Sequence, residues 1–380
     1  MVKEITRYIK KEVERELWAR AAGRCQFDGC NKLLYKSPIT QEQVNIAQKA
    51  HIYSFSKNGP RGWGFLNKKE LNNIDNLMLM CHDCHKTIDN DKEGIKYSAQ
   101  LLQQWKREHE ERVYIVTGID SDKKSHVVFY GSNISEQKSP LQKYEAMEAM
   151  FPLYYPANEN PINLSMTGSH IDSNDNFWQI EAGHIEKIFA QQIEPKIVEN
   201  NPSHFSLFAL APMPLLIKLG ALFTDKISVD IFQPIREPKT WKWQTEPFEF
   251  SFIIHKSASK DFPPVLIVSL SGKISHERVI SILGKDIDIW EITVNEDFLH
   301  NDLMRSKLQL STFRSEMRKL ISEINQIHND KELCIFPAMP VSCAIELGRI
   351  RMPKSDMSWI IYDQNNKKKK FIKTLIIGEK

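Results

Sequence analysis

Two pairs of cysteines near the start of the chain constrain its fold more than any other feature. Cys25 and Cys30 form the first pair, and Cys81 and Cys84 form the second. Each spacing lets one tight loop supply two thiolates, and two such loops complete the tetrahedral shell that a structural Zn²⁺ prefers. A zinc ion held in this way would stabilise a segment with little hydrophobic core of its own. We therefore predict a zinc-supported domain in this part of the chain.

The length of the chain and its other two cysteines set wider limits. A chain of 380 residues exceeds one ordinary domain, so two or three domains are expected. Cys334 and Cys343 lie in apolar stretches, and we interpret them as buried, reduced thiols of a cytoplasmic protein. No apolar run approaches the about 20 residues of a membrane-spanning helix, and the charged N-terminus lacks the apolar core of a secretion signal.

A second set of residues, interleaved with the cysteines, indicates metal-assisted hydrolysis. His85 and Asp89 are one helical turn apart, so an imidazole nitrogen and a carboxylate oxygen can hold one cation from the same helix face. Such a cation would stabilise negative charge on a scissile phosphate. His51, on a short extended segment, could take a proton from the attacking water. Asn76 could fix the orientation of the His51 imidazole through a side-chain hydrogen bond.

Each of these residues also has a purely structural interpretation. His51 could be a satisfied strand histidine, His85 could replace a cysteine in the zinc shell, and Asp89 could be a first-turn acid favoured by the helix dipole. Taken together, with His51 between the two cysteine pairs and His85 and Asp89 directly after the second, they favour a nuclease instead. Residues 1–117 hold 20 lysines and arginines against 15 acidic residues, an excess that suits DNA but that a solvated surface would also explain. The predicted DNA contacts are Lys57, Arg61, Lys68 and Lys69.

Residues 15–115 resemble an HNH endonuclease domain of the ββα-metal type. The resemblance rests on Cys25 and Cys30, the AHI around His51, the DNL around Asn76, the CHDCH that ends at His85, and Asp89. It implies that His51 is the general base, that Asn76 orients it and that His85 binds the catalytic cation. Two positions depart from the family pattern, because Ala50 stands where a metal ligand is common and Asp89 stands where histidine is common. Only two protein ligands then remain, which favours Mg²⁺ with its bound waters.

Beyond residue 117 the composition changes, and the chain contains a weak internal repeat. A polar segment at 118–125 reads as a linker between a nuclease domain at 1–117 and a second domain at 126–380. The repeated pieces are LSMTG at 164–168 with VSLSG at 268–272, and APMPLLIKLG at 211–220 with PAMPVSCAIELG at 337–348. Long helices are predicted between these pieces, at 176–198 and 302–327. We predict a multidomain α+β and α/β protein whose second domain contains two tandem Rossmann-like units of parallel strands and helices.

Ligands bind such sheets at the carboxyl ends of the strands, where loops and helix N-termini offer backbone N–H groups to phosphates. Four turns of the repeat fall at such ends: Thr167-Gly168, Met213-Pro214, Ser271-Gly272 and Met339-Pro340. Charge and stacking could come from residues just past the first copy, namely Arg236, Lys239 and Trp241. The alternative is that the four turns only allow the helices to pack, and that the charged and aromatic residues occupy ordinary surface or core positions. A pseudo-symmetric crevice would suit a ligand with two phosphates and two bases.

The region 125–375 resembles the SAVED domain, a fusion of two CARF-like units that senses cyclic oligonucleotides. The resemblance rests on the repeated strand-helix pattern and on the Met-Pro and Leu-Gly pairs. The order HNH then SAVED resembles the DNA-degrading effectors of CBASS anti-phage systems. This implies a cyclic dinucleotide activator of the cyclic GMP-AMP type, assembly into a homo-oligomer between dimer and tetramer, and cleavage of double-stranded DNA without strong sequence preference.

Two other functions are consistent with the same sequence. The first is a constitutive or sequence-specific HNH restriction endonuclease whose C-terminal half reads DNA. That half is slightly acidic and shows no helix-turn-helix or zinc-finger pattern, which disfavours it. The second is a non-enzymatic zinc-binding regulator in which His85 serves the structural metal.

Overall fold

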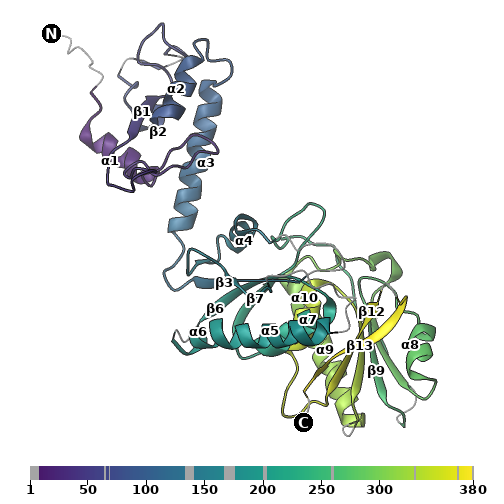
Figure 1. Ribbon diagram of the computed structural model, residues 1–380. Helices are drawn as coiled ribbons and strands as arrows, with labels where there is room; N and C mark the ends of the chain where they lie inside the picture. Colours follow the sequence, from purple (N-terminus) through teal and green to yellow (C-terminus); the bar gives the residue numbers. More distant parts are fainter. Residues whose placement is uncertain are drawn as a thin grey trace, which may run out of the picture. The chain divides into compact units, whose positions relative to one another are not determined.

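The chain folds as two compact units, Met1–Asp120 and Ser121–Lys380 (Figure 1). The division falls inside the segment predicted as a linker. The computed structural model describes residues 8–63, 66–67, 69–132, 141–166, 176–199, 203–257, 261–328, 331–365 and 368–378. Lys68, Thr167 and Gly168, which were predicted as site residues, lie outside these ranges. Within them, no helix combines the length and apolar character needed to cross a bilayer.

The N-terminal unit is built around a two-stranded antiparallel sheet. Its elements are α1 Lys11–Arg20, β1 Ala47–His51, the 3-10 turn η1 Ile74–Asn76, β2 Leu77–Cys81, α2 His82–Asn90 and α3 Ala99–Thr117. β2 is apolar up to its final cysteine and is buried along its whole length. Leu17 and Ala21, four residues apart in the sequence, are both buried in the same hydrophobic cluster. The Ser98 hydroxyl accepts a hydrogen bond from Leu101 N at 3.2 Å and so caps the N-terminus of α3.

The C-terminal unit contains two larger sheets and the helices that cover them. Its first half comprises β3 Lys124–Gly131, α4 Lys143–Met150, β4 Tyr155–Pro156, β5 Ile162–Asn163, α5 Phe177–Gln192, α6 Glu194–Glu199, β6 His204–Leu210, α7 Met213–Phe223 and β7 Ser228–Phe232. Its second half comprises β8 Ile253–His255, β9 Pro264–Ser269, α8 His276–Leu283, β10 Asp288–Thr293, the 3-10 turn η2 Glu296–Phe298, α9 Lys307–His328, β11 Leu333–Ala338, α10 Val341–Arg349, β12 Trp359–Asn365 and β13 Lys370–Ile377.

The two sheets share one order of parallel strands. In the first sheet β3 pairs with β5 and β6, and β6 pairs with β7. In the second sheet β9 pairs with β10 and β11, and β11 pairs with β12. All of these pairs are parallel. β4 adds a further parallel strand to the first sheet, whereas antiparallel β8 and β13 close the edges of the second.

One hydrophobic core joins the two sheets. It contains one face of each sheet together with the buried sides of α5, α7, α9 and α10 (Figure 1). α4 covers the opposite face of the first sheet, and α8 covers the opposite face of the second. α7 and α10 contact each other at the centre of this arrangement. The carboxyl ends of β3, β6, β9 and β11 therefore belong to one continuously packed body.

The strand order corrects the predicted alignment of the repeat. LSMTG follows β5, whereas VSLSG contains the end of β9, which occupies the position of β3 in the shared order. The two strings match because each is a strand end followed by small residues. The strand before the long helix α9 is β10, and the prediction omitted both β10 and α8. The predicted helix 176–198 is divided into α5 and α6.

Candidate active site and ligand-binding edge

Four thiols from two segments converge in the N-terminal unit. The sulfur atoms of four cysteines all lie within 4.8 Å of one another: Cys25, Cys30, Cys81 and Cys84. The sulfurs of Cys30 and Cys81 are 3.9 Å apart. Four sulfurs placed about 2.3 Å from a zinc ion are separated from each other by about 3.8 Å. The cluster therefore fits a tetrahedral Zn²⁺, in agreement with the cysteine spacing.

The surroundings of the cluster also suit a cation. The backbone N–H of Cys81 donates a hydrogen bond to the Cys25 sulfur at 3.3 Å. Burial raises the pKa of the Cys25 thiol to about 12, so this sulfur would stay protonated at neutral pH without a cation beside it. A bound zinc ion supplies the positive charge that converts such a thiol into a thiolate ligand.

β1, β2 and α2 place the predicted catalytic residues in a ββα arrangement. His51 ends β1 opposite Leu77, Asn76 immediately precedes β2, and α2 packs against both strands. His85 Nε2 lies 3.4 Å from Asp89 Oδ2, so the two predicted cation ligands meet on one face of α2. Their side chains are 29% and 49% exposed, which leaves this face open to solvent and to a phosphate.

Asn72, which the sequence did not single out, contacts the His51 imidazole. His51 Nε2 lies 2.9 Å from Asn72 Oδ1. A neutral imidazole would donate its Nε2 proton to this carbonyl oxygen, and its basic nitrogen would then be Nδ1. Asn76, only 3% exposed, accepts from Tyr53 N and donates to the carbonyl oxygens of Tyr53 and Leu71. Its amide therefore braces the backbone after His51, in place of the predicted bond to the imidazole.

The predicted DNA contacts separate into exposed and buried residues. Lys57 and Lys69 are exposed. Arg61 is not, because only 3% of its side chain is accessible and its guanidinium donates hydrogen bonds to backbone carbonyl oxygens. The prediction that Arg61 is an exposed DNA contact is therefore wrong.

The Met-Pro pairs of the repeat begin two packed helices of the C-terminal unit. α7 starts at Met213 with Pro214 in its first turn, and Pro340 directly precedes α10. Proline suits these positions because its φ is fixed and it has no N–H that needs an acceptor. Both turns follow parallel strands, β6 and β11, at their carboxyl ends. Pro214, Met339 and Pro340 are buried, and Met213 is half-buried.

Ser271 and Gly272 lie at the carboxyl end of β9. Ser271 N donates to Ala338 O at 2.8 Å, which ties the end of β9 to the end of β11. A Cβ added to Gly272 would meet no atom within 4 Å, so the space beside this residue is open. In the first sheet Ser132 N donates to Leu210 O at 3.2 Å and ties β3 to β6 in the same manner.

Two buried hydroxyls at the end of β3 have no hydrogen-bond partner within the described ranges. They belong to Tyr130 and Ser132, which are 0% and 5% exposed. Burial is the main cause that raises the pKa of Tyr130 well above its usual value, so its hydroxyl stays protonated. Buried hydroxyls without a partner are uncommon. No pattern in the sequence indicated either residue.

The residues predicted to add charge and stacking do not act together. Arg236 is exposed, and Lys239 Nζ pairs with Glu145 at 2.8 Å. Trp241 is 7% exposed and packs edge-on against Phe208, with 5.4 Å between ring centroids. The predicted stacking role of Trp241 is wrong, because this ring fills the core between the first sheet and α4.

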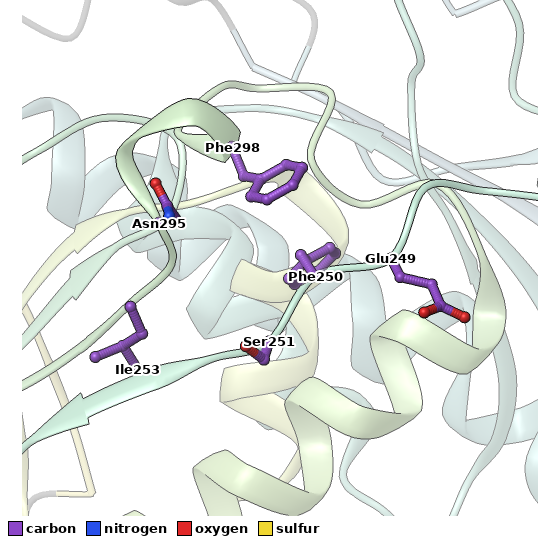
Figure 2. Close-up of a pocket in the computed structure, with 6 residues that line it drawn as sticks. All are labelled: Glu249, Phe250, Ser251, Ile253, Asn295 and Phe298. Atoms are coloured by element: carbon purple, nitrogen blue, oxygen red, sulfur yellow. The ribbon is translucent and has the colours of Figure 1, made fainter.

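An open hollow of about 480 Å³ lies at the outer edge of the second sheet and was not predicted. Figure 2 shows its lining, which comes from the turn after β10 and from the extended chain that enters β8: Glu249, Phe250, Ser251, Ile253, Asn295 and Phe298. The rings of Phe250 and Phe298 have centroids 6.3 Å apart. The carboxylate of Glu249 disfavours a phosphate in this hollow.

Solved structures similar to this chain include Cap4 receptors. The Acinetobacter baumannii Cap4 SAVED/CARF-domain containing receptor with the cyclic trinucleotide 2'3'3'-cAAA is 12% identical, with a TM-score of 0.42 over 77% of this chain and 61% of that chain. A second structure of the Acinetobacter baumannii Cap4 SAVED/CARF-domain containing receptor is 12% identical, with a TM-score of 0.41 over 83% of this chain and 66% of that chain. The Moraxella osloensis Cap4 SAVED/CARF-domain containing receptor is 11% identical, with a TM-score of 0.36 over 82% of this chain and 66% of that chain. This chain thus spans 61% to 66% of the length of these receptors.

Two family models match the chain, whereas a search of curated proteins found no match. The model of an HNH endonuclease matches residues 25–95, the range that holds the cysteine cluster and the ββα arrangement. The SAVED model, described as a SMODS-associated and fused to various effectors sensor domain, matches residues 185–377, just over half of the chain. The chain belongs to the SAVED family and joins this sensor domain to an N-terminal HNH endonuclease domain.

Proposed function

We propose that this protein is a metal-dependent endonuclease that degrades double-stranded DNA when a cyclic oligonucleotide binds its SAVED domain, as an effector of bacterial CBASS anti-phage defence. One observation carries the proposal: the chain that places His51, His85 and Asp89 around a cysteine-supported ββα arrangement also contains the sensor domain. We assign residues 1–117 to the nuclease, 118–125 to the linker and 126–380 to the sensor.

In the nuclease, His51 would accept a proton from the attacking water at Nδ1, while its Nε2–H would donate a hydrogen bond to Asn72 Oδ1. Asn76 would keep the backbone after His51 rigid. His85 and Asp89 would hold the catalytic divalent cation, for which we propose Mg²⁺. When bound, this cation stabilises the negative charge that develops on the scissile phosphate.

The proposed substrate contacts are exposed lysines of the same unit. Lys57 and Lys69 carry ammonium groups that can neutralise DNA phosphates without reading sequence. Binding of this kind is compatible with the proposed non-specific degradation. It also predicts that DNA binding weakens as the salt concentration rises.

In the sensor, we propose two CARF-like units, each formed by one sheet and its helices. The shared order of parallel strands supports this division. The ligand would lie at the carboxyl ends of β3, β6, β9 and β11, where Ser271 and Gly272 border open space. Tyr130 and Ser132 offer buried hydroxyls there that a ligand could engage. We propose a cyclic dinucleotide of the cyclic GMP-AMP type as the activator.

Activation requires that the ligand bind the active assembly better than the free protomer. About 5 kcal/mol of differential affinity moves a population from almost entirely inactive to almost entirely active. We propose that the ligand drives homo-oligomerisation, between dimer and tetramer, and that paired nuclease domains then act on one duplex.

The test is plasmid degradation by purified protein in the presence of a panel of cyclic di- and trinucleotides and Mg²⁺. We expect degradation with one class of cyclic nucleotide, no defined end sequence, and complete loss of cleavage in His51→Ala with zinc content and ligand binding retained. Equal cleavage with and without every cyclic nucleotide would contradict the proposed control. Fragments with a fixed end sequence would indicate a restriction enzyme instead.

A further inference from the structure

Arg61 joins the two parts of the candidate nuclease site through its buried guanidinium. Its Nε donates to Ile52 O at 2.6 Å, and Ile52 directly follows His51 in the chain. One terminal nitrogen donates to Ile88 O at 3.0 Å, and the other lies 3.7 Å from Asp89 Oδ1. The three nitrogens of one rigid, planar group therefore contact both the strand end that carries the base and the helix that carries the cation ligands.

The same guanidinium fixes the orientation of the ligand pair. Asp89 turns one carboxylate oxygen toward Arg61 and the other toward His85 Nε2, at 3.4 Å. Arg61 thus orients Asp89, and Asp89 in turn orients His85. Contacts of this kind behind the metal ligands set the direction of their donor atoms. A lysine at position 61 could not make the three contacts of Arg61, because one ammonium group cannot span three acceptors in fixed directions.

The local backbone is also built around this side chain. Arg61 has a φ of 62°, in the left-handed region that non-glycine residues seldom adopt. Gly94, in the loop after α2, packs so closely that an added Cβ would lie 2.7 Å from Arg61 Cγ and 3.3 Å from Arg61 N. A strained backbone and a closely fitted glycine are retained where the surroundings hold a residue firmly in place.

We infer that Arg61 is a positioning residue of the nuclease, which sets the place of the His51 strand end relative to His85 and Asp89. The inference deepens the proposed function and rests on it. Burial excludes Arg61 from direct contact with DNA, since only 3% of its side chain is exposed. Its contribution to the reaction is therefore geometric, and a misplacement of about 1 Å between reacting groups can cost about 100-fold in rate.

The left-handed backbone makes Arg61→Gly the informative variant, because glycine adopts this φ without strain and only the side chain is lost. We expect cleavage to fall about 100-fold. We also expect Mn²⁺ binding at the HNH site, followed by electron paramagnetic resonance, to weaken about tenfold. Zinc content, DNA binding by the metal-free protein and cyclic-nucleotide binding should match the wild type. Millimolar guanidinium ion should restore much of the lost cleavage by entering the vacated space, whereas Arg61→Lys should remain impaired.

The matched control is Arg107→Met, which removes an exposed guanidinium of α3 that forms no ion pair with any described residue and should leave cleavage unchanged. Wild-type cleavage and Mn²⁺ affinity in Arg61→Gly would overturn the inference. Loss of zinc in that variant without rescue by guanidinium would also overturn it, because Arg61 would then serve stability alone. A wild-type protein that never cuts DNA would instead overturn the proposed function and the inference with it.

Discussion

Gly220 of α7 lies against the backbone of α10, and Gly348 of α10 lies against the backbone of α7. A Cβ added to Gly220 would overlap the carbonyl oxygen of Ile345 and lie 2.8 Å from its carbonyl carbon. A Cβ added to Gly348 would overlap the carbonyl oxygen of Ile217 and lie 2.7 Å from Ala221 N. The contact is reciprocal, as a two-fold relation between the helices requires, and it accounts for the repeated Leu-Gly pair in the sequence.

This close crossing predicts that Gly348→Ala destabilises the C-terminal unit. The added methyl group cannot be accommodated unless the two helices separate, which typically costs about 1–3 kcal/mol. Urea unfolding of the full chain should show an earlier transition for the C-terminal unit. Gly183→Ala in α5 is the control, because its Cβ would meet no atom within 4 Å and alanine favours a helix over glycine by up to about 1 kcal/mol. Equal transitions in the two variants would show that the crossing has no energetic role.

The crossing also shows what the sequence could and could not predict. Ligand types at fixed spacing were sufficient for the cysteine cluster and for the pair His85 and Asp89, because tetrahedral chelation and helix periodicity depend on local distances. The repeated Leu-Gly pairs lie in α7 and α10, where glycine lets the two helices approach closely, but the sequence alone did not reveal this crossing. The alignment of LSMTG with VSLSG was wrong because strand ends resemble each other in any parallel sheet.

Burial and long-range contacts were harder to predict. Arg61 lies in a loop rich in glycine and polar residues, which is typical of an exposed position, and only the folded chain brings Ile52, Ile88 and Asp89 around it. Asn72 is 21 residues from His51 in the chain, a separation that no helix or strand periodicity relates. Trp241 illustrates the opposite error, since an aromatic residue next to lysines can belong to the core.

Asn72→Asp should move the acid limb of the pH–rate profile of DNA cleavage to higher pH. A carboxylate in place of the Asn72 amide, 2.9 Å from His51 Nε2, would favour the imidazolium form and so raise the pKa of His51. The imidazole can act as a general base only when it is neutral. As the pH falls, the variant would therefore lose activity at a higher pH than the wild type does. Single-turnover cleavage across the pH range measures this limb. Asn73→Asp adds the same charge at the neighbouring exposed position and should shift the limb much less; identical profiles for all three proteins would remove His51 from the role of base.

Cys25→Ser should lower the zinc content and the thermal stability of the N-terminal unit. The thiol of Cys25 has a pKa raised to about 12 mainly by burial, so zinc must displace its proton on binding. Zinc affinity of the wild type should therefore fall as the pH falls, which competition with a colorimetric chelator can measure. Cys334→Ser is the control, because Cys334 lies in the C-terminal unit outside the cluster. Full zinc content in Cys25→Ser would contradict the four-sulfur site.

Acid should weaken the C-terminal unit through His204, which lies at the amino-terminal end of β6. Burial is the main cause that lowers the pKa of His204, although Asp230 opposes it, and the ring stacks on Tyr154 with 3.9 Å between centroids. The unfolded chain, where histidine has a pKa of about 6.5, therefore binds the proton more readily than the folded protein. The stability that His204 contributes is complete above that pH and is lost as the pH falls toward the lower folded-state pKa.

Urea unfolding at a series of pH values should show this decline, and His204→Gln should reduce it. His255→Gln, at an exposed position of β8, should leave the decline unchanged, and a decline of the same size in all three proteins would assign the acid sensitivity to other groups.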